Sequence, residues 1–392
     1  MHIPGHIILL GACAALLGQS AVAGPVPYAG IPMPGVFKRF QDIYQRNIIA
    51  SLGETGCTKR NIAVRKSWDE IDDATRLDYI RAVHCLAARP PKTDVDTIKN
   101  VAPGIVNRLD DFTYIHINQT NIIHQSGYLL PWHRIFLWQM ETALRDECGY
   151  KGHLPYWDNA RFSEAQTQSR LFDGAPTSFG GDGAHVAHGV SNINLPGLAI
   201  NFTLPRLPGT GGGCVTSGPF TNYTISLGPV AKPVIDPANK YGYQPNPRCL
   251  SRDLFDGASR GVLTWANATA IVASDSIGGL RGNVESLWHL NSHTYVGLEA
   301  ADPFSTPNDP VFYLLHAQID RLWAIWQGQD LAARTYAIDG NRTFFGIPLD
   351  YAPDVPPSLA TIEDPMELGL GMRPQAKEGM PMTKYGRCYI YE

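Results

Sequence analysis

The sequence lacks the features by which a chain usually recognises a membrane or a nucleic acid. None of its apolar runs is long enough to span a bilayer, since a transmembrane helix needs about 20 consecutive apolar residues. No basic run occurs, and 36 aspartates and glutamates outnumber 32 lysines and arginines, which gives a formal net charge of −4. These absences argue against a nucleic-acid or membrane partner. The chain also has no internal repeat and no low-complexity tract.

Cysteine is scarce, with 7 in 392 residues, and its distribution bears on the compartment. Residues 1–23 hold a short apolar stretch that ends in Ala21-Val22-Ala23, which predicts a signal peptide and a secreted mature protein. Cys13 would leave with that peptide, and the other six cysteines are even in number and widely scattered. In an oxidising compartment this predicts three disulfides, of which Cys214 with Cys249 is the preferred pair. Four Asn-x-Ser/Thr sequons are plausible glycan sites, at Asn201, Asn222, Asn267 and Asn341.

The remaining composition is that of a globular protein with a large core, because 44% of the residues are hydrophobic and 10% are aromatic. Apolar periodicity and end signals predict four helices, over residues 67–85, 131–149, 284–294 and 310–328. The first would open with a capping box from Ser67 to Glu70, and the last with Asn308 or Asp309 as N-cap. Residues 163–260 are rich in Gly, Pro and Asn and predict loops and short strands. We therefore expect a mainly α fold, a four-helix bundle wrapped by long loops and a few short β-strands.

Histidines are concentrated in and beside the predicted helices. Six of the ten that follow the predicted signal peptide form two groups of three: His116, His124 and His133, then His289, His293 and His316. Two histidines four residues apart on a helix share one face. A neutral imidazole buried among Trp and Phe needs a polar partner, and a metal ion supplies one. Imidazole-only coordination suits copper, zinc, iron or nickel, so the two groups predict two metal ions close together.

Two further expectations concern the surroundings of these histidines. The segment from His116 to His124 holds Asn118, Thr120 and Asn121, and we expect it to bend so that both histidines converge. Asp320 lies one turn after His316, where its carboxylate could accept a hydrogen bond from a ligand imidazole and fix its tautomer. The remaining histidines, at positions 84, 153, 185 and 188, receive no role, and the last two are expected at the surface.

Beyond their spacing, the histidines stand in motifs that resemble a known family. His124, the triplet Trp132-His133-Arg134 and Glu141 resemble the copper A signature of the tyrosinase, catechol oxidase and haemocyanin family. The stretch DPVFYLLHAQID, residues 309–320, matches the copper B signature at every fixed position, and PYWD follows the copper A segment as it does in the family. IHINQT and RDECGYKG resemble the short secreted fungal branch.

The resemblance implies a binuclear type 3 copper centre with O2 as co-substrate and small phenolic substrates. It implies one catalytic domain over residues 24–392, with a copper A region at about 100–160 and a copper B region at about 280–328. Many relatives carry a C-terminal shielding domain, and the 64 residues after Gly328 are too few for one, so we expect an open enzyme. We also expect a monomer or weak dimer, with no cysteine–histidine link, because Ile122 stands where that cysteine would be.

Four residues carry the expected catalytic and access roles. By resemblance, Glu285 is the carboxylate that holds a water near the site. Phe304 overhangs the pocket, and Phe312 packs near copper A. Arg134 and Glu141 are expected to lie just behind the ligands. Relatives with strong monophenol hydroxylation often have Asn after the first copper B histidine, where this chain has Leu290. We therefore expect oxidation of o-diphenols to o-quinones with weak monophenol hydroxylation. The alternatives are a true tyrosinase, a phenol oxidase that tailors a secondary metabolite, an O2 carrier resembling haemocyanin, and a structural zinc protein.

Overall fold

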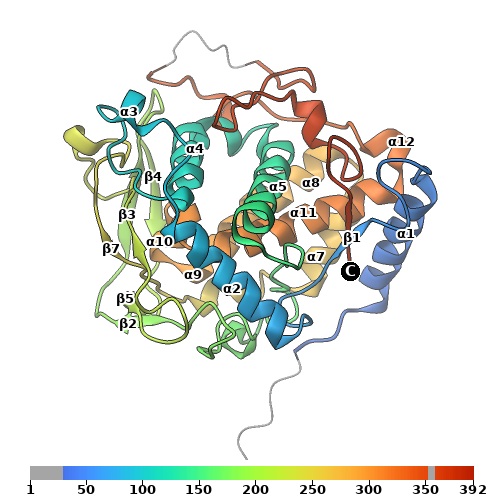
Figure 1. Ribbon diagram of the computed structural model, residues 1–392, viewed down its shortest axis with the longest axis horizontal. Helices are drawn as coiled ribbons and strands as arrows, with labels where there is room; N and C mark the ends of the chain where they lie inside the picture. Colours follow the sequence, from blue (N-terminus) through green and yellow to red (C-terminus); the bar gives the residue numbers. More distant parts are fainter. Residues whose placement is uncertain (1–29, 352–357) are drawn as a thin grey trace, which may run out of the picture.

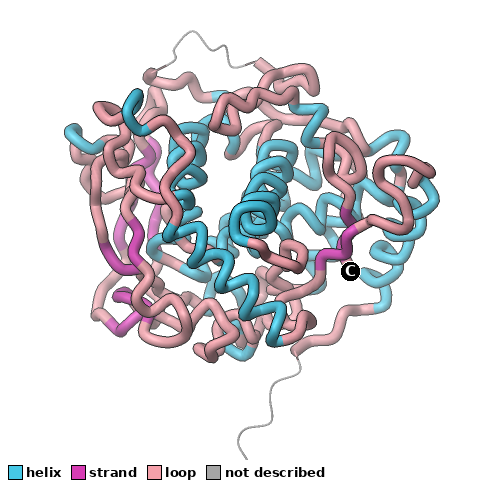
Figure 2. Tube along the Cα trace, viewed as in Figure 1, coloured by secondary structure: helices cyan, strands magenta, loops and turns pink. Residues whose placement is uncertain are grey.

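The computed structural model describes residues 30–351 and 358–392, so the predicted signal peptide lies outside the described residues. Helices dominate the molecule and the strands are few and short, as Figures 1 and 2 show. The expected mainly α fold with a helical bundle is therefore confirmed. No helix among the described residues is long and apolar enough to cross a membrane.

A bundle of four helical segments forms the centre of the molecule. Figure 1 shows two of these segments, α4 and α5, in the middle of the view with α11 passing behind them. The segments are α4 (Arg108–Ile123), α5 (Leu129–Cys148), the continuous run of α8 (Ile277–Asn283), η3 (Val284–His289) and α9 (Leu290–Val296), and α11 (Val311–Gln329). Helix α11 is buried along almost its whole length and packs against α5. It is the central helix of the core.

Two of the predicted helices begin or end at the residues that the sequence indicated. Helix α5 ends before Gly149, whose φ of 69° is left-handed, and the Gly149 amide donates to the carbonyl of Arg145. Helix α11 begins after Pro310, and the Asp309 carboxylate accepts a hydrogen bond from the Val311 amide. It runs one residue beyond Gly328, so the predicted stop at that glycine was slightly early.

The predicted capping box at Ser67 was wrong. Helix α2 spans Asp73–Ala88 and is capped by Asp72, whose carboxylate accepts from the Thr75 amide. The Glu70 carboxylate instead accepts from Arg161 Nη1 at 3.0 Å, and the Ser67 hydroxyl accepts from the Asp69 amide at 3.3 Å. The motif had the right residue types, but Glu70 pairs with an arginine distant in sequence and the Ser67 hydroxyl forms a local turn.

The expected bend between His116 and His124 was also wrong. This segment belongs to α4, which begins with a capping box: Asn107 accepts from the Asp110 amide, and the Asp110 side chain accepts from the Asn107 amide. The Thr120 hydroxyl donates to the His116 carbonyl one turn back, which is compatible with an unbroken helix. The sequence analysis also missed α1 (Gly35–Ser51), which packs along α11.

The remaining elements wrap the bundle. The hairpin of β3 (Ser191–Leu195) and β4 (Phe202–Arg206) is antiparallel and pairs Leu195 with Phe202. The other short elements are α3 (Val95–Ile98), α6 (Asp256–Ser259), α7 (Trp265–Val272), α10 (Leu298–Ala301), α12 (Leu331–Arg334), β1 (Ala63–Arg65), β2 (Gly183–His185), β5 (Gly212–Val215), β6 (Thr224–Ile225), β7 (Arg248–Cys249), β8 (Tyr389–Tyr391), and the 3-10 turns η1 (Gln166–Gln168), η2 (Pro237–Asn239), η4 (Thr306–Asn308), η5 (Phe344–Gly346) and η6 (Ala376–Gly379).

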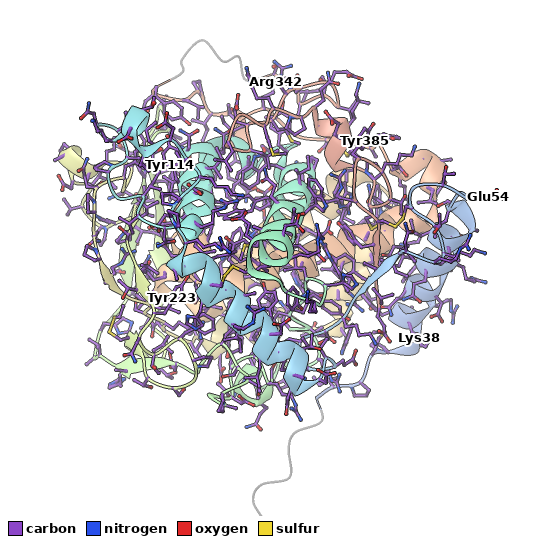
Figure 3. The ribbon with its side chains drawn as sticks, in the orientation of Figure 1. Lys38, Glu54, Tyr114, Tyr223, Arg342 and Tyr385 are labelled. Atoms are coloured by element: carbon purple, nitrogen blue, oxygen red, sulfur yellow. A yellow bond between two sulfur atoms is a disulfide. The ribbon has the colours of Figure 1, made fainter. Side chains whose placement is uncertain are left out.

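Three disulfides cross-link the chain, one of them between α2 and the bundle helix α5, and Figure 3 draws disulfides as yellow bonds. They join Cys57 to Cys388, Cys85 to Cys148, and Cys214 to Cys249, so both the predicted number and the preferred pair are confirmed. All six cysteines of the described residues are thereby engaged. None of them is left for a bond to a histidine, in agreement with the expectation.

Candidate metal centre

The structure brings the six predicted histidines together as two groups of three. In each group one ring nitrogen per histidine lies within 4.8 Å of the others, and all six side chains are buried. The groups are His116, His124 and His133, and His289, His293 and His316. Among the described residues no other His, Cys, Asp or Glu group has this geometry.

Backbone carbonyls orient the histidines of the first group. The Nδ1 atom of His116 lies 2.7 Å from the Phe304 carbonyl oxygen. The Nδ1 atom of His124 lies 3.0 Å from the Thr120 carbonyl oxygen, and that of His133 lies 2.8 Å from the Leu129 carbonyl oxygen. A carbonyl only accepts, so each Nδ1 carries the proton and each Nε2 keeps its lone pair. Three Nε2 lone pairs are thus turned toward a common point.

The second group combines a π-helical turn with the central helix. His289 ends η3, a π-helix, and His293 follows one turn later in α9, with the two rings 4.6 Å apart. The Nδ1 of His293 donates to the Ala300 carbonyl at 2.7 Å. The Nε2 of His293 lies 3.0 Å from that of His289 and 3.3 Å from that of His316. Single π turns inside helices are frequent at functional sites, and here one ends at a histidine of the group.

The two groups face each other across a narrow gap. The rings of His124 and His289 are stacked with centroids 5.5 Å apart, and those of His133 and His316 are stacked at 4.2 Å. Phe312 packs against both groups, with its centroid 5.2 Å from His116 and 4.2 Å from His316. Phe312 therefore has the packing position expected for it.

The donor set fits a pair of metal ions. The Nε2 atoms of His116 and His133 are buried and have no hydrogen-bond partner among the described residues. Burial lowers the pKa of all six imidazoles, that of His124 to about 3 and that of His293 to about 4. Neutral imidazole is the form that binds metal ions, and two sets of three suit copper or zinc. A metal ion on the first set would satisfy its unpaired nitrogens, and one on the second set would accept the lone pairs of the Nε2 atoms that lie 3.0 and 3.3 Å from one another.

A cavity of about 230 Å³ opens onto the histidines. Its lining includes three histidines of the two groups, Glu285, Leu290 and several apolar side chains. One Glu285 oxygen accepts a hydrogen bond from the Gln125 amide, and the other lies 3.3 Å from Arg281 Nη1. Burial raises the pKa of Glu285 to about 8, although the Gln125 amide and Arg281 oppose the shift. The structure thus places Glu285 and Leu290 beside the histidines, as the sequence indicated.

Two predicted positions need correction. The Phe304 side chain does not line this cavity: it is buried in a second apolar cluster with Ile117 and Leu198, and its carbonyl holds His116. Asp320 does not bind His316, whose Nδ1 has no partner among the described residues. The spacing in sequence correctly predicted that Phe304 and Asp320 lie near the histidines, but it did not predict the direction of their side chains.

Asp320 instead belongs to a buried ionic network behind the histidines. It accepts from Arg134 Nε at 2.6 Å and from the hydroxyls of Tyr389 and Tyr391 at 2.7 Å each. Glu141 pairs with Arg65, which also lies 3.7 Å from Asp320. Burial alone would raise the pKa of Glu141, but Arg65 and hydrogen bonds lower it to about 2. Arg134 and Glu141 therefore stabilise the bundle and do not contact the six imidazoles.

The sequence analysis missed the residues that form the mouth of the cavity. Phe202 and Leu204 reach it from β4, and Phe344 and Phe345 from η5. Gln125, directly after His124, also lines it. The apolar alternation of the β4 strand was a weak local signal, but nothing local tied either segment to the histidines.

The histidines without an assigned role lie outside the two groups. His188 Nε2 bonds the Asp253 carboxylate at 2.8 Å, and His185 is exposed, so both are at the surface as expected. His153 is 3.6 Å from Glu141, and His84 stacks on Phe220.

Comparisons with known proteins agree with this geometry. The family described as the common central domain of tyrosinase matches residues 106–329, more than half of the chain. Tyrosinase P of Aspergillus terreus is 37% identical over 345 residues, covering 84% of this chain and 91% of that protein. An N-acetyl-6-hydroxytryptophan oxidase of Emericella nidulans is 34% identical over 86% of this chain and 94% of its own length. The solved structure of a mutant polyphenol oxidase from Thermothelomyces thermophila has a TM-score of 0.80 and 32% identity, covering 92% of this chain and 99% of that one.

Proposed function

The chain belongs to the tyrosinase family of binuclear copper oxidases, and from that premise we propose that it oxidises o-diphenols to o-quinones with O2. Hydroxylation of monophenols is at most a weak second activity. In the proposed reaction each diphenol gives up two electrons and two protons, and O2 takes up four of each to become two waters. Two diphenols are therefore consumed for each O2.

The facing histidine groups are the single observation that carries this proposal. We assign His116, His124 and His133 to one copper ion, and the other three histidines to the second. When bound, a pair of copper ions supplies the redox chemistry that couples phenol oxidation to O2 reduction. The carbonyls at the Nδ1 atoms hold the rings in place, and the burial of all six side chains keeps the nitrogens from water.

The preference for diphenols rests on what surrounds Glu285. A base that removes a phenol proton must be ionised and free to receive it. Burial raises the pKa of Glu285 to about 8, which favours its protonated form at neutral pH, and its two oxygens already contact the Gln125 amide and Arg281. Leu290 follows His289 and lines the cavity. Its side chain has no amide group with which to hold a water beside that carboxylate. An o-diphenol is easier to oxidise and does not require ring hydroxylation.

A substrate panel with the copper-loaded enzyme tests the proposal. We expect fast O2 uptake with 4-methylcatechol and slow uptake, after a lag, with tyrosine. Rapid hydroxylation of tyrosine without a lag would establish a true tyrosinase. Reversible O2 binding without turnover of any phenol would establish an O2 carrier, and zinc with no copper would establish a structural zinc protein.

The substitution Leu290→Asn tests the assignment of residue 290. It supplies the amide that the resemblance associates with monophenol hydroxylation, at a position whose side chain is 45% exposed and lines the cavity. We expect tyrosine hydroxylation to increase relative to 4-methylcatechol oxidation, with little loss of stability. Leu290→Gln is the matched control, since its side chain carries the same amide group one methylene farther from the backbone. An equal response of both substrates would contradict the role of this position.

A tailoring oxidase of secondary metabolism is the second candidate. It is favoured by the likeness to an N-acetyl-6-hydroxytryptophan oxidase, a relative named for its modified hydroxytryptophan substrate. On this alternative the enzyme would oxidise one elaborate phenol far faster than simple catechols. Turnover of 4-methylcatechol as fast as that of any larger phenol in the panel would exclude it.

We further propose that the protein acts in an oxidising, extracellular compartment as a single catalytic domain. Three disulfides in a chain of this size support this location, because cytosolic thiols are kept reduced. Sequencing the amino terminus of the protein recovered from culture medium tests it, with a start after Ala23 expected. Retention of the full chain inside cells would contradict it, and sedimentation would test the expected monomer or weak dimer.

A further inference from the structure

Two residues beside the cavity have strained backbones. Gln125 has φ 48°, and Phe345 has φ 49° and ψ 20°, a left-handed conformation that is costly for side chains of this size. They are joined directly, because the Phe345 amide donates to the Gln125 carbonyl at 3.0 Å. Such strain clusters at functional sites, where the surrounding structure maintains it. Gln125 directly follows His124, so the geometry of Phe345 is tied to that of the metal centre.

The strained backbone holds a large aromatic side chain at the mouth of the cavity. Phe345 lines the cavity, yet 53% of it is exposed. Its ring centroid lies 4.9 Å from Phe344 and 6.3 Å from Phe202, at an interplanar angle of 32° to the latter. Phe202 and Leu204 stand on the same face of β4, since alternate residues of a strand share a face. The outer cavity therefore has apolar walls on two sides and one partly uncovered ring.

The same cavity offers no cation to the carboxylate of an amino-acid substrate. No lysine or arginine is among the described residues that line it. Arg281 lies beside Glu285 but is already paired with that carboxylate and with Asp339. A substrate carboxylate entering here would lose water without gaining a cation, which is unfavourable.

We propose that Phe345, with Phe202 and Leu204, forms a second ring-binding subsite, and that the preferred substrate is a neutral catechol with a flat aromatic substituent. This inference rests on the proposed diphenol oxidation. The catechol ring lies at the histidines and the substituent stacks on Phe345. Amino-acid catechols such as L-dopa are correspondingly poor substrates. Phe345 is a specificity-determining residue and takes no part in the chemical step.

The test compares 4-phenylcatechol, 4-methylcatechol and L-dopa in the wild type and in Phe345→Gly. Glycine adopts positive φ readily, so this variant removes the ring and should not impair folding. We expect kcat/KM for 4-phenylcatechol to fall up to about tenfold, mainly through KM, because one aromatic contact is lost. The value for 4-methylcatechol should stay within about twofold on the same reasoning. Phe345→Trp, which keeps an aromatic ring, should retain the preference.

Tyr385→Gly is the matched control. Tyr385, labelled in Figure 3, is 46% exposed and has φ 55°, but it does not line the cavity. A second readout is calorimetric binding of 4-phenylphenol and 4-methylphenol under anaerobic conditions, where no turnover occurs. We expect Phe345→Gly to weaken only the binding of 4-phenylphenol.

Equal losses for all substrates in Phe345→Gly, or none, would overturn the subsite. So would a wild-type preference for L-dopa over 4-phenylcatechol. Failure of the wild type to oxidise 4-methylcatechol would instead refute the proposed function, and the anaerobic binding comparison would still decide whether the subsite exists.

Discussion

Replacing Glu141 by Gln should destabilise the protein by about 3 kcal/mol at neutral pH. Glu141 and Arg65 are a buried ion pair behind the metal centre, and Glu141 also accepts a hydrogen bond from the Leu154 amide at 3.1 Å. Its pKa is about 2 in the folded protein against an ordinary value of 4.5. At about 1.36 kcal/mol per pKa unit, this difference corresponds to roughly 3.4 kcal/mol. Breaking a buried pair by removing one partner typically costs about 3–5 kcal/mol, which is of the same size.

The sign of the pH dependence follows from the lowered pKa of Glu141. Because the folded protein favours the ionised carboxylate, this stabilisation is complete above pH 4.5 and is lost as the pH falls toward 2. Glu141→Gln has no such group to titrate. The difference in unfolding free energy between wild type and variant should therefore be full at pH 7 and should shrink steadily below pH 4.5.

The assay is urea unfolding of the metal-free protein with its disulfides intact, since bound metal would add its own stabilisation. Measurements at pH 7, 4 and 2.5 give the difference between wild type and variant at each point. Glu54→Gln is the control, because Glu54 is an exposed glutamate at the surface (Figure 3). A loss below 1 kcal/mol at pH 7, or a difference that does not shrink at pH 2.5, would refute the reasoning.

Three further predictions concern other parts of the core. Phe312→Ala should cost about 3–5 kcal/mol in unfolding free energy and weaken copper retention, because the ring packs on both histidine groups; an unchanged denaturation midpoint would contradict this. Burial raises the pKa of Asp158 from 3.8 to about 6, so the fold loses stability as the pH rises from 3.8 to 6; Asp158→Asn should therefore be more stable by up to about 3 kcal/mol at pH 7 but not at pH 3. Replacing Cys85 and Cys148 by Ala opens a loop with a sequence separation of 63 and should lower the unfolding free energy by about 4 kcal/mol, measured by the same urea titration.

The metal centre could be predicted because its signals are local. His289 and His293 are one turn apart, and His316 stands in a motif within a helix that is mostly apolar and buried along almost its whole length. Such a helix must be central, so its one histidine must be buried. The copper A motif likewise determined where His133 lies in α5.

The mistaken predictions concern contacts between segments far apart in the sequence. Asp320 is one turn from His316, yet its partners Arg134 and Tyr389 come from other segments. Asn118 and its polar neighbours suggested a bend, but the capping box at Asn107 and tertiary packing keep α4 helical. Phe345 reaches the cavity only because the 3-10 turn η5 meets the segment after His124, which no periodicity could indicate.

Copper content is the measurement that tests the central claim most directly. Mass spectrometric metal analysis of the purified protein should give two copper ions per chain, and His116→Ala and His316→Ala should each retain no more than one. Zinc in place of copper, or two copper ions still held by either variant, would contradict the assignment of the six histidines.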